Sequence, residues 1–177
     1  LPKHVSHKGD IDLVTEYDTR SENHILHRLT TLFPSDEIIA EESGHLTLDR
    51  NSEFTWYVDP LDGTTNYAHS FPFFAVSIAI AHQGQIVAGV VLDPLRDELF
   101  AAEKGRGATL NENLISVSET LTLDHSLLAT GFPYDVRTTK DNNLDQFSRV
   151  ILRAQGIRRA GAAALDLCYT ANSRLDA

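Results

Sequence analysis

Acidic side chains stand where two short apolar segments of the sequence end. Glu41 follows Ile38–Ala40, and Asp59 follows a segment rich in aromatic residues, with Asp62 three residues later. Strand ends hold side chains in place near solvent, and oxygen atoms are the ligands that Mg²⁺ takes at roughly 2.0–2.1 Å. The pattern therefore predicts a metal site. Its expected ligands are the side chains of Glu41, Asp59 and Asp62 and the carbonyl oxygen of Leu61.

The residues that follow this turn suit a phosphate group. Gly63 lets the backbone approach a ligand closely. Backbone N–H groups at the start of a following helical turn attract anions. Thr64 adds a hydroxyl that can position a water molecule. The segment thus favours binding of a phosphate beside the metal ion.

Each of these signals has a simpler interpretation when it is taken alone. An Asp-Pro pair followed by Asp-Gly is typical of a surface turn. Glu41 and Glu42 also fit a solvated face, and Asp18 fits a residue at the start of a helix. The eight histidines lack metal-ligand spacing, which disfavours a zinc site. Cys168 lies among apolar residues, so we interpret it as a core residue rather than a nucleophile.

The composition limits which binding partners and which cellular compartment are expected for this chain. The chain has 177 residues, a formal net charge of −10 and no long Lys/Arg block, so nucleic acid and anionic membranes are poor partners. A single cysteine excludes an internal disulfide framework and favours a reducing compartment. No apolar stretch approaches the ~20 residues that span a bilayer, and no signal peptide is evident. We therefore expect a cytoplasmic protein.

The elements that position these residues predict an α/β fold. Thr19 and Glu22 form a candidate capping box, an apolar stripe follows from Ile25, and Pro34 ends this helix. Period-two alternation over residues 73–81 and several neighbouring strands predict a mainly antiparallel sheet flanked by helices. The other expected strands are 38–40, 54–58, 86–92, 98–102, 114–117, 127–130 and 157–160, and the other expected helices are 144–155 and 162–171.

Two domains are expected. Residues 1–145 would form an α+β metal-binding domain, and residues 146–177 would begin a second α/β domain. The chain contains no Met and ends without a terminating signal, so we expect it to be truncated at both ends.

One continuous segment carries a specific resemblance. Trp56-Tyr57-Val58-Asp59-Pro60-Leu61-Asp62-Gly63-Thr64-Thr65-Asn66-Tyr67 resembles the central motif of the inositol monophosphatase family. Residues 12–18, 130–135 and 159–168 are similar to other segments of that family, in the same order. Residues 40–43 resemble a further one, with Ala40 in place of Gly. The N-terminal helix of the family has no counterpart in this sequence. The later Trp-Asp motif of the family has none either, since Trp56 is the only tryptophan.

The resemblance implies a layered α-β sandwich and a set of residue roles. Glu41, Asp59, the Leu61 carbonyl and Asp62 would bind metal. Thr64, hydrogen-bonded to Asp18, would orient or deprotonate the attacking water, with Glu41 assisting. Residues at the substrate would be Asp62, Gly63, Thr64, Gly161, Ala162 and Ala163.

The resemblance also implies the reaction and its partners. Two or three Mg²⁺ ions would activate a water for in-line attack without a covalent phosphoenzyme, and Li⁺ would inhibit. Inositol 1-monophosphate is the expected substrate among small phosphorylated polyols and sugars, and a homodimer is expected. Fructose-1,6-bisphosphate, 3′-nucleotides, NADP and histidinol phosphate remain alternative substrates. A binding or regulatory role with RNA transcription factors is an alternative of a different class.

Overall fold

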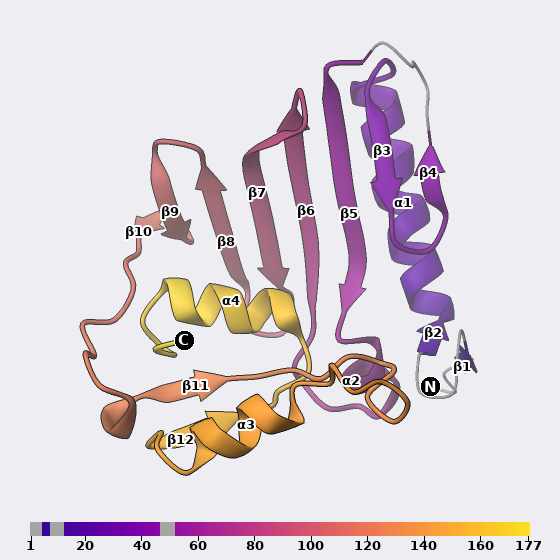
Figure 1. Ribbon diagram of the computed structural model, residues 1–177. Helices are drawn as coiled ribbons and strands as arrows, with labels where there is room; N and C mark the ends of the chain where they lie inside the picture. Colours follow the sequence, from indigo (N-terminus) through magenta and orange to yellow (C-terminus); the bar gives the residue numbers. More distant parts are fainter. Residues whose placement is uncertain (1–4, 8–12, 47–51) are drawn as a thin grey trace.

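A mainly antiparallel sheet of eight strands dominates the computed structural model, which describes residues 5–7, 13–46 and 52–177 (Figure 1). The spatial order of its strands is β10-β9-β8-β7-β6-β5-β3-β4. Only β3 and β5 pair in parallel. The bounds are β3 Glu37–Ala40, β4 Gly44–Leu46, β5 Phe54–Asp62, β6 Ala75–His82, β7 Gln85–Asp93, β8 Glu98–Glu103, β9 Gly107–Leu110 and β10 Asn113–Leu114.

Helices cover both faces of this sheet (Figure 1). On one face, α1 (Glu16–Leu32) places Leu29 against Ile38 and Val58 in a buried apolar cluster. On the other face, α4 (Ala163–Ala171) packs Leu165 against residues that include Phe100. The predicted fold class, an α-β sandwich with a mainly antiparallel sheet flanked by helices, is confirmed.

The alternation of side chains in β6 explains why this strand packs against the helices on both faces of the sheet. Successive side chains of a strand point to opposite faces. Ala75 belongs to the cluster beneath α4, whereas Ile78 packs against the cluster beneath α1. Burial raises the pKa of the Cys168 thiol on α4 to about 11, which supports its interpretation as a core residue.

The start of α1 corrects one sequence prediction. Within residues 15–22, threonine followed three residues later by an acidic residue occurs twice, and the structure uses the first instance. Thr15 is the N-cap, and its capping box is completed by Asp18, not by the predicted pair Thr19 and Glu22. The predicted box is wrong because the helix begins directly after strand β2 (Leu13–Thr15), which pairs with β1 (Val5–His7). Glu22 is therefore free of a capping role.

A second, smaller sheet lies below the main one in Figure 1. Strands β11 (Leu127–Ala129) and β12 (Gly156–Arg158) pair in parallel, with α3 (Leu144–Ile151) between them in sequence. The division into residues 1–145 and 146–177 stays a prediction, and this strand pairing crosses it. The remaining helices are short: α2 spans Thr64–Ala68, and a 3₁₀ helix spans Leu123–His125. The expected strand 114–117 is wrong, since β10 ends at Leu114.

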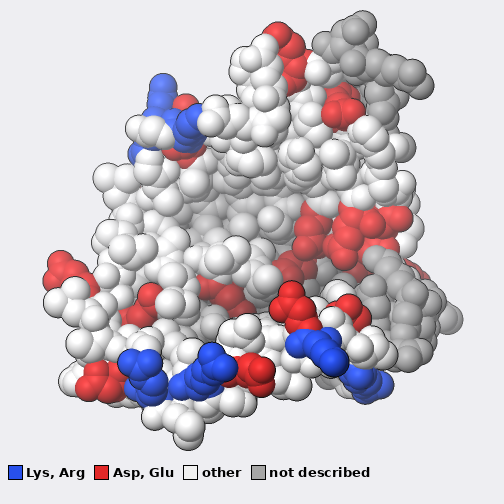
Figure 2. Space-filling model, viewed as in Figure 1, with Lys and Arg blue, Asp and Glu red and all other residues white. Residues whose placement is uncertain are grey.

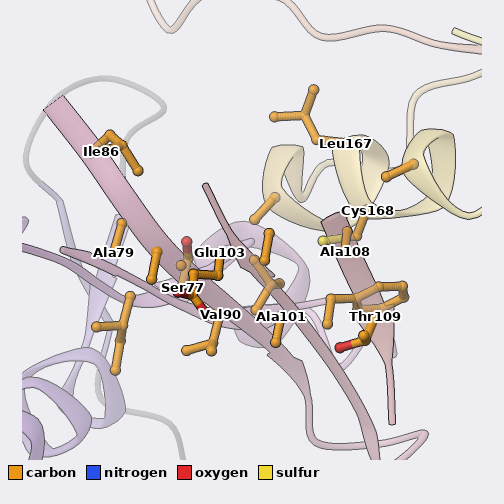
Figure 3. A pocket seen from close by; sticks show the side chains of 18 of the residues that line it. Ser77, Ala79, Ile86, Val90, Ala101, Glu103, Ala108, Thr109, Leu167 and Cys168 are labelled. Atoms are coloured by element: carbon orange, nitrogen blue, oxygen red, sulfur yellow. The ribbon is translucent and has the colours of Figure 1, made fainter. Parts of the chain in front are cut away.

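A cavity of about 580 Å³ lies between part of α4 and strands β6 to β9 (Figure 3). Its walls are almost entirely small or apolar side chains, such as Ala79, Val90 and Ala101, with Glu103 and Lys104 as the charged exceptions. In the described part of the chain, no helix combines the length and apolar character needed to cross a membrane.

The packing beneath α1 generates a stability prediction. Ile38 is fully buried between α1 and the sheet, whereas Ile86 on β7 is 51% exposed. Ile38→Ala should lower the free energy of unfolding by roughly 2–5 kcal/mol, because it leaves a cavity in a packed core. Ile86→Ala is the matched control and should cost far less. Equal losses for both variants in urea unfolding would contradict the described packing.

Candidate active site

Parallel pairing of two strands brings the first two acidic residues together. Ala40 on β3 lies opposite Val58 on β5. Glu41 and Asp59 are the next residues along these two strands, so both emerge at the same edge of the sheet. A register shift in β5 between Asp59 and Asp62 then turns the chain towards α2. Figure 2 shows acidic side chains gathered on this side of the molecule.

The carboxyl groups interact strongly with one another. Burial, a hydrogen bond with Glu41 and the negative charges of Glu41 and Asp62 together raise the pKa of Asp59 to about 8. The raised pKa favours a protonated Asp59 side chain that is hydrogen-bonded to Glu41. Burial also raises the pKa of Asp62, although backbone N–H groups of α4 oppose this effect.

Asp62 connects the sheet to α4. Its carboxylate accepts hydrogen bonds from the N–H of Ala163 at 3.2 Å and of Ala164 at 2.7 Å. The N-cap residue Ala162 has no side chain that could make these bonds. Free N–H groups at a helix start are satisfied by acceptors of this kind, and negative charge is favoured there. Asp62 thus caps α4 from more than a hundred residues away in the sequence.

The carboxylates are gathered but not arranged as metal ligands. Within residues 5–7, 13–46 and 52–177, no three His, Cys, Asp or Glu side chains are grouped so as to hold a metal ion. In the structure, Glu41 is hydrogen-bonded to Asp59, and the Asp62 carboxylate accepts from the N-terminus of α4. The metal site of Glu41, Asp59, Leu61 and Asp62 therefore stays a prediction. Its donor set fits a divalent cation, which would relieve the repulsion among these groups.

Asp18 connects the start of α1 to Thr64. One carboxylate oxygen, Oδ2, accepts the N–H and the hydroxyl of Thr15 at 2.8 and 2.5 Å. The other, Oδ1, accepts the Thr64 hydroxyl at 2.8 Å. Asp18 is 1% exposed, so both contacts are shielded from water. The Asp18 carboxylate thus does both things that were expected of it: it caps the start of α1, and it binds the Thr64 hydroxyl.

The chain has no room for a side chain at position 63. Gly63 has φ +94°, and an added Cβ would lie 3.0 Å from the Phe73 carbonyl oxygen and 3.2 Å from the Cβ of Ala162. Asn66 holds the same region by donating to the carbonyl oxygens of Phe73 and Ala160, at 2.7 and 2.8 Å. Glycine at this turn therefore keeps the start of α2 close to α4.

These elements enclose a cavity of about 460 Å³. All six residues predicted to contact substrate line it: Asp62, Gly63, Thr64, Gly161, Ala162 and Ala163. Glu41, Asp59 and Asp18 are not among its lining residues. The cavity also has lining residues that the sequence did not single out, and these include Phe132, Tyr134, Arg159 and Asp166.

Asp166 differs from the other residues of this wall. Its Oδ1 is buried, and no hydrogen-bond partner for it occurs among the described residues. Burial and the charge of Asp62 raise the pKa of Asp166 to about 6. Asp166 lies within residues 159–168, one of the segments that carried the resemblance, but no role was predicted for it.

The sequence matches known proteins along its length. A model of the Inositol monophosphatase family matches residues 2–177. The chain is 50% identical over 165 residues to an inositol-1-monophosphatase of Synechocystis sp., which covers 93% of this chain and 57% of that protein. It is 44% identical over 176 residues to Nus factor SuhB of Pseudomonas aeruginosa, which covers 98% of this chain and 65% of that protein.

The fold matches a solved structure equally well. The crystal structure of extragenic suppressor protein suhB from Bartonella henselae has a TM-score of 0.89 and 41% sequence identity. The match covers 98% of this chain and 66% of that chain. The chain thus spans less than two thirds of the length of these three relatives.

The raised pKa of Asp59 generates a prediction for the metal-free protein. Folded Asp59 keeps its proton up to about pH 8, whereas the unfolded residue loses it near 3.8. Between these values the folded state binds more protons, so this residue's contribution to stability falls as pH rises. Asp59→Asn removes that loss while its amide can still donate to Glu41. The free energy of unfolding of the variant should exceed that of the wild type by a margin that grows with pH, to on the order of 1 kcal/mol at pH 8. This value allows for screening by solvent at the half-buried site.

Urea unfolding between pH 5 and 8.5 measures this difference. Asp97→Asn makes the same change at an exposed position on a turn and should show a difference that does not depend on pH in this range. A constant difference for Asp59→Asn would contradict the placement of Asp59 among the other carboxylates.

Proposed function

Since this chain belongs to the inositol monophosphatase family, we propose that it carries the reaction site of a Mg²⁺-dependent phosphate monoester hydrolase. The observation that carries this proposal is the 2.8 Å hydrogen bond from the Thr64 hydroxyl to Asp18, beside the gathered carboxylates of Glu41, Asp59 and Asp62. A buried carboxylate that orients a hydroxyl next to a set of oxygen donors is an arrangement for activating water.

Glu41, Asp59, Asp62 and the Leu61 carbonyl would hold Mg²⁺. When bound, Mg²⁺ supplies positive charge that lowers the pKa of a coordinated water and stabilises the charge developing on the phosphate. For these side chains to bind it, Asp59 must release the proton that it shares with Glu41. Asp62 can keep its contacts with α4 through part of its carboxylate, since each carboxylate oxygen accepts more than one bond.

Thr64 would position the attacking water. Its hydroxyl proton points to Asp18, with the Leu61 carbonyl oxygen as a longer alternative at 3.1 Å. The oxygen lone pairs of Thr64 are then available to accept a hydrogen bond from the attacking water, which would orient it. Asp18 makes this orientation the favoured one, because a hydrogen bond to an ionised acceptor is stronger than one to a carbonyl. Glu41 would assist as a proton acceptor, as the family resemblance implies.

The 460 Å³ cavity would take the substrate, with the phosphate at the N–H groups of Gly63 and Thr64. Gly161, Ala162 and Ala163 form a wall of small residues that leaves room for a polyol ring. Inositol 1-monophosphate is the substrate that we propose, in line with the name of the Synechocystis relative. Fructose-1,6-bisphosphate, 3′-nucleotides, NADP and histidinol phosphate are the alternatives that a substrate panel must include.

A regulatory role is the second candidate function. The Pseudomonas aeruginosa relative is named Nus factor SuhB, and it is 44% identical to this chain. A pull-down of transcription factors, compared with a phosphatase assay of the same full-length protein, distinguishes the two functions. A cytoplasmic location, a homodimer, a requirement for two or three Mg²⁺ ions and inhibition by Li⁺ are further parts of the proposal.

Thr64→Ala tests the assigned chemistry in the full-length protein. The variant should keep Mg²⁺ binding, because carboxylates and a carbonyl would hold the ion. It should lower kcat by on the order of 10²–10⁴-fold, because the hydroxyl orients the water. Asp18→Asn should give a similar loss, and the double variant should lose little more if the two residues act as one unit.

Thr31→Ala serves as the control for loss of a hydroxyl. Thr31 is exposed on α1, and its hydroxyl donates only to the His27 carbonyl oxygen at 2.7 Å. This variant should keep the kcat of the wild type. If Thr64→Ala lowered thermal stability but kept kcat at saturating Mg²⁺, Thr64 would be only a turn residue, and the proposed mechanism would fail.

A further inference from the structure

One side of α1 contacts three separate segments at the candidate site: the start of α2, the end of β5 and the loop between β3 and β4. Asp18, Ser21 and Glu22 have the spacing i, i+3 and i+4, which places side chains on the same side of a helix. Asp18 accepts the Thr64 hydroxyl, and Ser21 donates to the carbonyl oxygen of Pro60 at 3.0 Å. Glu22 reaches the loop that follows β3. The first contact belongs to the proposed reaction, whereas the third has no role in it so far.

Glu22 binds the backbone of the loop that carries Glu41. Ala40 pairs with Gly44, so residues 41–43 form a three-residue hairpin loop between β3 and β4. One oxygen of Glu22, Oε2, accepts the N–H of Glu42 at 2.8 Å, and Oε1 accepts the N–H of Ser43 at 3.0 Å. Successive backbone N–H groups form a concave site for an anion. Glu22 supplies that anion from within the chain.

These bonds are partly buried and hold the loop from a distant part of the sequence. Glu22 is 3% exposed, and it lies 20 and 21 residues before its two partners. A carboxylate that accepts backbone N–H bonds makes charge-assisted contacts, which are about twice as strong as neutral ones. Removal of a buried acceptor also leaves the N–H groups without a partner. The loop is therefore tied firmly to α1.

The backbone of Glu41 is fixed from the sheet as well. Its N–H donates to the carbonyl oxygen of Val58 at 3.0 Å. The N–H groups of three consecutive residues, Glu41, Glu42 and Ser43, are thus all bonded, the first to β5 and the other two to Glu22. The main chain on both sides of the Glu41 Cα has one defined path, which sets the direction in which the Glu41 carboxylate leaves it.

We propose that Glu22 is a positioning residue that presents Glu41 to the metal ion. This inference rests on the proposed function, because it assigns Glu22 a role in Mg²⁺ binding through Glu41. Glu22 does not touch the ion or the substrate. It acts by holding the hairpin loop at the distance from β5 that lets Glu41 and Asp59 serve one site.

Glu22→Gln in the full-length protein is the test. The two side chains have the same shape, but the Gln amide carries an NH₂ group that cannot accept a bond from a backbone N–H. One N–H of the loop then faces a donor, and the loop must shift. Residues that orient metal ligands typically change metal affinity by 10–100-fold when they are replaced. We expect a loss of this size in Mg²⁺ affinity, measured by calorimetry with Mg²⁺ alone, and a kcat near that of the wild type at saturating Mg²⁺.

Glu103→Gln is the matched control, because it removes one negative charge at an exposed site on β8 whose partner is Arg106. It should keep the wild-type Mg²⁺ affinity. A folded Glu22→Gln protein with reduced thermal stability but unchanged Mg²⁺ affinity would show a purely structural role and overturn the inference. Failure of the wild type to bind Mg²⁺ would overturn the proposed function and this inference with it. If Glu22→Gln does not fold, Glu22→Asp decides, since it keeps the charge but shortens the reach and should weaken Mg²⁺ binding severalfold.

Discussion

Repulsion among carboxylates held together at the edge of a sheet is the constraint on which the rest of this structure depends. The parallel pairing of β3 and β5 places Glu41 beside Asp59, and the turn after β5 adds Asp62. The charges of Glu41 and Asp62 both act to keep Asp59 protonated. Like charges at such short range destabilise the metal-free protein, so the surrounding chain must hold them in place. The same repulsion is what gives the site its expected affinity for a cation.

Two helices provide that support from opposite faces of the sheet. On one face, Asp18, Ser21 and Glu22 of α1 bond to the start of α2, to the end of β5 and to the loop between β3 and β4. On the other face, Asp62 caps α4, so a predicted metal ligand also joins the main sheet to the later part of the chain. The acidic residues, the turn at Gly63 and the 460 Å³ cavity are therefore linked through hydrogen bonds made by side chains rather than through ion pairs.

The sequence predicted well what local patterns encode. Strand alternation in residues 73–81 and the helix ending before Pro34 both appear in the structure, and the motif around Asp59 and Gly63 pointed to the turn that lines the cavity. Long-range contacts were not accessible in this way. The choice of Thr15 over Thr19 as N-cap depends on where β2 ends, and the role of Glu22 depends on a loop 20 residues away. The capping of α4 by Asp62 and the buried oxygen of Asp166 arise only once the chain is folded.

Calorimetric titration of the full-length protein with Mg²⁺, in buffers of different ionisation enthalpy, tests the central claim most directly. If the carboxylates form the metal site, binding at pH 7 must displace the proton that Asp59 shares with Glu41. The observed heat should then depend on the buffer, and the affinity for Mg²⁺ should fall as pH is lowered below about 8. Binding of Mg²⁺ without proton release, and with the same affinity at pH 6 and pH 8, would contradict the account.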